Sequence, residues 1–128
     1  MKNLIIAVDF DGTLVHHEYP DIGAEVPEAI ACCKYLQDKG AELILWTMRS
    51  DHTLKEALRW CHDRGLYFYG VNVNPDQSWT RSPKAYAHYY IDDAACGCPL
   101  LYHPGKRPVV DWPAVLQMIT VKEEYLNG

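Results

Sequence analysis

Apolar stretches of strand length alternate along this chain with segments in which apolar residues recur every three or four positions. Four such stretches lie at residues 4–8, 41–46, 67–73 and 89–91, and polar or turn-forming residues follow each of them. They are rich in aliphatic, β-branched and aromatic side chains, which is typical of strands buried on both faces of a parallel sheet. A short fifth strand is expected at residues 100–102.

Three amphipathic segments lie between or after these strands and predict helices. The first begins near Pro27, where a proline suits the first helical turn, and it ends at Gly40. The second runs from about Asp51 to Gly65, and the third begins at Asp111. In each segment the apolar residues fall on one face at the helical period, so each helix is expected to pack against a sheet.

Regular alternation of strands and helices predicts an α/β fold. We expect a single Rossmann-like domain over residues 1–128, with a parallel sheet of about five strands, helices on both faces and a frayed tail at residues 123–128. Right-handed crossovers would bring the carboxyl ends of all the parallel strands to one edge of the sheet. Ligands of open α/β sheets bind at that edge.

Acidic residues follow two of the predicted strands. The first strand stops at Asp9, with Asp11 two positions later, and the fourth stops at Asp92 and Asp93. Carboxylates this close repel each other unless a cation or a shared proton relieves them. A divalent cation such as Mg²⁺, which prefers oxygen ligands, is the expected partner. Gly12 would let the chain turn sharply and expose backbone N–H groups.

Residues 9–13, Asp-Phe-Asp-Gly-Thr after an apolar strand, resemble motif I of the haloacid dehalogenase (HAD) superfamily. Three further positions match the pattern of that superfamily. The first is Thr47, which places a hydroxyl after the second strand. The second is Lys84, before the fourth strand, and the third is the acid pair at 92–93. The resemblance covers residues 4–93 and implies a small HAD-like hydrolase. An aspartate at the second acidic position of motif I points to a phosphatase or phosphotransferase.

The resemblance also implies catalytic roles. Asp9 would be the nucleophile that takes the phosphoryl group as an aspartyl-phosphate, and Asp11 would protonate the leaving oxygen and then activate water. Thr47 would donate a hydrogen bond to a phosphoryl oxygen, and Lys84, with Arg81 as the competing candidate, would neutralise its charge. The implied ligands of Mg²⁺ are Asp9, Asp11 through its backbone carbonyl, Asp92 and Asp93. Asp92 is favoured over Asp93 as the direct ligand.

The predicted function is Mg²⁺-dependent hydrolysis of a phosphate monoester that the sequence does not name. One alternative is a non-catalytic or regulatory protein that binds phosphate and Mg²⁺, and another is a polynucleotide-end phosphatase. The net charge of −5 offers no basic surface for long nucleic acid. We therefore expect a phosphorylated small molecule, or another phosphorylated substrate that can enter an open site.

The segment between Thr13 and the first helix, and the segment between Thr47 and Lys84, leave no room for a cap domain. The site is expected to be open unless a homo-oligomer supplies a lid from a partner subunit, and residues 14–25 and 74–83 would set specificity. Arg49 is expected to cap or form a salt bridge more than to touch the substrate. The candidate substrate contacts are Gly12, His16, His17, Tyr19, Met48, Arg49, Trp79 and Arg81.

Cysteine content and the lack of long apolar runs indicate the compartment. The five cysteines are an odd number, which fits reduced thiols in the cytoplasm. The spacing of Cys96 and Cys98 is not that of a zinc knuckle, and no second pair is present. No apolar run approaches the roughly 20 residues that a membrane helix needs, and the run after Lys2 is too short for a signal peptide. A cytoplasmic protein without membrane contact is expected.

Overall fold

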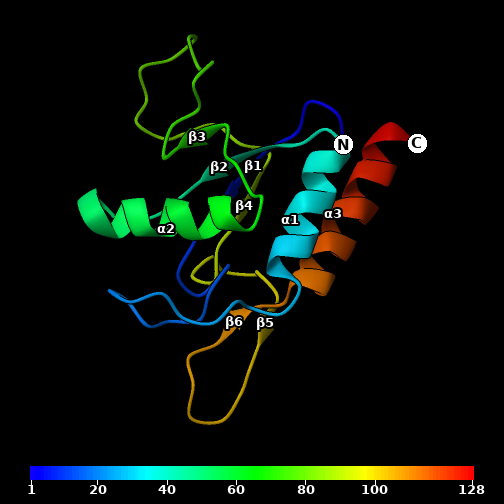
Figure 1. Cartoon of the computed structure of the whole chain (residues 1–128). Helices are drawn as coiled ribbons and strands as arrows, with labels where there is room; N and C mark the ends of the chain where they lie inside the picture. The colour runs from blue at the N-terminus through cyan, green and yellow to red at the C-terminus, as the bar shows by residue number, and fades with distance from the viewer.

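A computed structural model of the protein describes residues 1–128 and confirms the α/β fold in one small domain (Figure 1). A parallel sheet of four strands has the order β3-β2-β1-β4. Its strands are β1 (Ile5–Val8), β2 (Glu42–Leu45), β3 (Gly70–Val71) and β4 (Tyr89–Ile91). The helices are α1 (Ala29–Asp38), α2 (Asp51–Asp63) and α3 (Trp112–Asn127).

The register of the sheet aligns the strand ends. Val8 of β1 is paired with Leu45 of β2 on one side and with Ile91 of β4 on the other. Because all three strands are parallel and end level with one another, the residues after them emerge side by side. The backbone N–H of Asp9 still donates to the carbonyl of Ile91, at 2.9 Å, so the first residue beyond β1 remains attached to β4.

The expected fifth strand forms, but outside the parallel sheet. β5 (Leu100–Leu101) pairs antiparallel with β6 (Val109–Val110) in a separate two-stranded hairpin. The N–H of Val110 donates to the carbonyl of Gly12, at 3.1 Å, which attaches this hairpin to the loop after β1. The parallel sheet therefore has four strands rather than about five, and β4 is left as its edge strand.

Helices cover one face of the sheet, whereas the sequence pattern predicts them on both. Buried residues of all three helices form one core with Ile6 and Leu43, and α1 lies between α2 and α3. The β1-α1-β2 and β2-α2-β3 units advance in the same direction, so right-handed crossovers place both helices on that face. The return from β3 to β4 would place a helix on the other face. Residues 72–88 form none, and their Ala87 packs against Ala7 and Ile44 there.

The helix ends follow ordinary capping chemistry. Ser50 and Thr53 form a reciprocal capping box at the start of α2, and the carboxylate of Asp111 accepts the N–H of Ala114 at the start of α3. Helix α3 continues to Asn127, so the expected frayed tail at 123–128 is instead helical for most of its length. No helix combines the length and the apolar character needed to cross a membrane.

Candidate functional site

Three carboxylates meet at the carboxyl edge of the sheet. Asp9 follows β1, and Asp92 and Asp93 follow β4. One oxygen atom from each of the three lies within 4.8 Å of the others, and all three residues are half-buried. The convergence predicted from the parallel strand order is therefore present, with the two acidic segments brought together from more than 80 positions apart.

The electrostatics of this cluster disfavour three negative charges. Burial, a hydrogen bond with the Asp93 side chain and the charges of Asp92 and Asp93 raise the pKa of Asp9 from 3.8 to about 8. Burial also raises the pKa of Asp92, although the N–H of Ala94 donates to its Oδ1 at 2.8 Å and opposes the shift. A bound cation would remove this repulsion. The donor set contains only oxygen, which fits a hard divalent cation such as Mg²⁺.

Thr13 and His17 surround the cluster with polar contacts. The buried hydroxyl of Thr13 donates to Oδ2 of Asp9 at 3.1 Å and accepts the N–H of Asp93 at 3.3 Å. Nε2 of His17 lies 3.1 Å from Oδ2 of Asp93. Thr13 thus links the two acidic segments, a role that the sequence pattern does not predict for it. In the sequence, only its position directly after Gly12, at the end of the 9–13 segment, points to a role at this site.

Position 12 needs a glycine for two reasons, its backbone conformation and the lack of room for a side chain. Its φ is +86°, in the left-handed region that favours glycine. A Cβ atom at this position would lie 2.3 Å from Nε2 of His17 and 2.6 Å from Cγ of Asp93. The loop after β1 can therefore approach both side chains only because residue 12 has no side chain.

The side chain of Asp11 lies outside the carboxylate cluster and pairs with Arg49. Nε of Arg49 donates to Oδ2 of Asp11 at 2.8 Å, and Nη2 donates to Oδ1 at 2.9 Å. Arg49 is buried and also donates to the carbonyl oxygens of Pro20 and Asp21, at 3.2 and 2.7 Å. Its guanidinium thus joins Asp11 to the 14–25 segment, in agreement with the expectation that Arg49 forms a salt bridge.

Thr47 lies just beyond β2, beside the loop after β1. Its hydroxyl accepts the N–H of Arg49 at 3.1 Å. The side-chain amide of Asn72 accepts the N–H of Thr47 at 2.8 Å and donates to its carbonyl at 2.9 Å. These contacts hold the end of β2 in one conformation. Asn72 was not singled out from the sequence, because its partner lies 25 positions away.

The remaining sequence candidates are not brought into contact with the carboxylates. Nζ of Lys84 lies 5.3 Å from the centroid of the Tyr90 ring, and the side chain is exposed. Arg81 and Trp79 are also exposed, and Met48 is 98% exposed. None of these side chains is among the groups that shift the pKa of Asp9, so the positive charge expected near the phosphoryl group is not beside Asp9 in this conformation.

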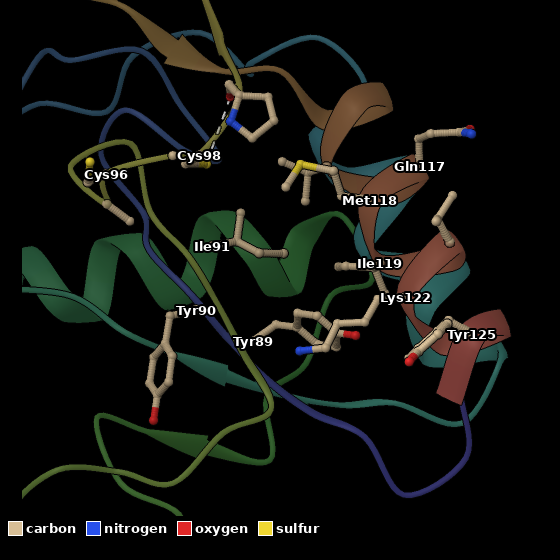
Figure 2. Close-up of a pocket in the computed structure, with 15 residues that line it drawn as sticks. Tyr89, Tyr90, Ile91, Cys96, Cys98, Gln117, Met118, Ile119, Lys122 and Tyr125 are labelled. Atoms are coloured by element: carbon tan, nitrogen blue, oxygen red, sulfur yellow. Dashed lines mark hydrogen bonds between the residues drawn. The ribbon is translucent and has the colours of Figure 1, made fainter. Parts of the chain in front are cut away.

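A separate, mostly apolar cavity lies elsewhere in the fold. It has a volume of about 880 Å³ and lies between the edge strand β4 and helix α3. Figure 2 shows Ile91, Met118 and Ile119 pointing into it, with Tyr125 at its rim. None of the clustered carboxylates lines this groove, and most of its walls are apolar. It therefore does not belong to the candidate metal site.

The comparisons with known proteins identify one relative by structure. The chain is 42% identical to the conserved protein coded by a locus from Bacteroides thetaiotaomicron, with a TM-score of 0.76. The match covers 93% of this chain and 91% of that one. No protein-family model matches, and no curated protein sequence matches. Given this identity over nearly the whole length of both chains, the protein belongs to the same family as that conserved Bacteroides thetaiotaomicron protein.

Proposed function

We propose that this protein is a Mg²⁺-dependent phosphatase of the haloacid dehalogenase superfamily that hydrolyses a phosphate monoester. One observation carries the proposal, namely the convergence of Asp9, Asp92 and Asp93 at the ends of two adjacent parallel strands. The motif-like segment 9–13 supplies a second acid, Asp11, two positions after the first. An oxygen-lined cation site next to a candidate nucleophile is what phosphoryl transfer to a carboxylate requires.

In this proposal a carboxylate oxygen of Asp9 would attack phosphorus as the P–O bond to the alcohol breaks, and the alcohol would leave with a proton. Water would then cleave the aspartyl-phosphate to inorganic phosphate and restore the Asp9 carboxylate. The hydroxyl of Thr13 on Oδ2 would fix the orientation of the Asp9 carboxylate. Mg²⁺ bound by Asp9, Asp92 and Asp93 would offset the charge of the carboxylates and of the phosphoryl oxygens. Thr47 would donate its hydroxyl proton to a phosphoryl oxygen, and Lys84 would leave the Tyr90 ring to reach the substrate.

Asp11 would act as the general acid and base, which requires a change in its contacts. Both of its oxygens accept hydrogen bonds from Arg49, so neither is directed to a leaving group in this conformation. Acid catalysis by Asp11 therefore includes separation from Arg49 and rotation towards Asp9. Because Arg49 also contacts the carbonyls of Pro20 and Asp21, substrate entry along the 14–25 segment would favour that separation.

The test is hydrolysis of 4-nitrophenyl phosphate with Mg²⁺, by the wild type, by Asp9→Asn and by the control Asp63→Asn. Asp63 is an exposed acid at the end of α2, so its replacement makes the same change of charge away from the cluster. We expect activity in the wild type and the control, and none in Asp9→Asn or in excess chelator. Substantial turnover by folded Asp9→Asn would refute the covalent mechanism.

A non-catalytic protein that binds Mg²⁺ and phosphate is the second candidate, and the pairing of Asp11 with Arg49 favours it. Such a protein would bind beryllium fluoride, a mimic of the phosphoryl group, in the presence of Mg²⁺ without hydrolysing any monoester. A phosphatase would do both. Measuring fluoride-complex binding and turnover on the same preparation separates the two candidates.

A further inference from the structure

A second, polar cavity lies beside the carboxylate cluster, between two segments that are far apart in sequence. Its volume is about 420 Å³. One wall comes from the loop after β1, and the other from the tip of the β5–β6 hairpin, which lies below that loop in Figure 1. The lining residues are His16, His17, Glu18, Ala24, Gly105, Lys106 and Arg107.

The charge of this cavity is positive although the protein carries a net charge of −5. Lys106 and Arg107 form no salt bridge, since the close contacts of this kind in the chain are those of Arg49 with Asp11 and of the His17 imidazole with Asp93. Burial, then Lys106, His103 and His17, lower the pKa of His16, and only Glu18 opposes them. With Glu18 as the one acid in the lining, the two cations leave an excess of positive charge around an open space, which an anionic ligand would offset.

Two connections position the cavity next to the proposed nucleophile. His17 lines the cavity and lies 3.1 Å from Oδ2 of Asp93, and its buried Nε2 has no hydrogen-bond partner of acceptable geometry. The start of helix α3, two residues after the hairpin, is also attached to the loop after β1, because the indole N–H of Trp112 donates to the carbonyl of Thr13 at 2.7 Å. The bond from Val110 to the Gly12 carbonyl reinforces this attachment. The cavity and the carboxylate cluster thus share one loop.

We propose that this cavity is an anion subsite in which Lys106, Arg107 and His16 bind a second anionic group of the substrate. The substrate class, which rests on the phosphatase function proposed above, is then a phosphate monoester that carries another phosphate or a carboxylate. Arginine binds either group through two parallel hydrogen bonds, and lysine adds a point charge. The reacting phosphate would lie at Asp9 while the second anion lies beyond His17.

The first test measures binding without catalysis. Inorganic phosphate is titrated into the Mg²⁺-free protein, where the acidic cluster repels it, and the amide shifts of His103 and of residues 105–107 are followed by NMR. The double variant Lys106→Gln/Arg107→Gln is compared with Lys55→Gln/Arg59→Gln, two exposed cations of α2 outside the cavity whose loss changes the net charge equally. We expect the hairpin variant to bind at least about tenfold more weakly than the wild type and the control. Equal binding by all three proteins would overturn the subsite.

The second test uses substrate pairs that differ only in the second anion. Fructose 1,6-bisphosphate against fructose 6-phosphate tests a phosphate, and 3-phosphoglycerate against glycerol 3-phosphate tests a carboxylate. We expect kcat/KM to be at least about tenfold higher for the doubly anionic member of one pair in the wild type and in the α2 control. The hairpin variant should lose that preference.

The outcomes separate this proposal from the function on which it rests. Phosphate binding at the hairpin without hydrolysis of any of the four monoesters would support the anion site and contradict the phosphatase. The opposite outcome is hydrolysis with the same kcat/KM for both members of each pair, in the wild type and in the hairpin variant. That result would support the phosphatase and overturn the subsite.

Discussion

Replacement of Asp9 by asparagine is expected to stabilise the metal-free protein at pH 8 even though it removes the proposed nucleophile. In the folded protein, burial and the neighbouring acids raise the pKa of Asp9 to about 8, whereas an unfolded chain leaves it near 3.8. The fold therefore favours the protonated carboxyl. The contribution of Asp9 to the free energy of unfolding is fully present below its pKa in the unfolded chain. It decreases as pH rises towards the pKa in the folded protein and does not change further above that value.

The magnitude follows from the size of the shift. Each pKa unit corresponds to about 1.4 kcal/mol, so ionising Asp9 in the fold at pH 8 costs at most about 6 kcal/mol. The residue is half-buried and water reaches part of it, and an asparagine at position 9 can still accept the hydrogen bond from Thr13. We therefore expect Asp9→Asn to raise the free energy of unfolding by about 2 kcal/mol at pH 8 and by nearly nothing at pH 4.

The assay is urea unfolding in the presence of chelator at pH 4, 5, 6, 7 and 8, for the wild type, Asp9→Asn and Asp63→Asn. Adding Mg²⁺ at about 100 times its Kd should raise wild-type stability by about 2.7 kcal/mol, with a smaller rise in Asp9→Asn. If Asp9→Asn has the same effect on stability at pH 8 as at pH 4, the carboxylate does not ionise against its neighbours and the reasoning is refuted.

Three further predictions concern the loop after β1 and its partners. Arg49→Lys should lower the free energy of unfolding by about 3 kcal/mol in urea, because a buried bidentate pair is broken, and unchanged stability would contradict this. Gly12→Ala should abolish Mg²⁺ binding measured calorimetrically, because its Cβ meets His17, whereas Gly105→Ala, also at positive φ but with open space around it, should retain binding. Asp11→Asn should slow hydrolysis of alkyl phosphates more than of 4-nitrophenyl phosphate, and equal slowing would refute its acid role.

Local patterns along the chain were sufficient to predict the acidic edge of the sheet. Strand-length apolar runs that stop at Asp9 and at Asp92-Asp93 identify two strand ends, and parallel pairing then brings them together. That inference needs only periodicity and the handedness of crossovers. The helix positions follow from the same kind of signal, because an amphipathic period and capping residues are properties of neighbouring positions.

The tertiary structure decided the features that depend on contacts between remote segments. The pairing of Asp11 with Arg49, the attachment of the β5–β6 hairpin to the loop after β1, and the position of Lys106 and Arg107 beside His16 have no periodic signal in the sequence. Each depends on the path of an irregular loop and on side-chain rotamers. Those rotamers are decided by contacts that form only when remote segments of the chain come together. The acidic cluster is thus a consequence of strand order, whereas the positions of Arg49, Lys106 and Arg107 are a consequence of loop packing.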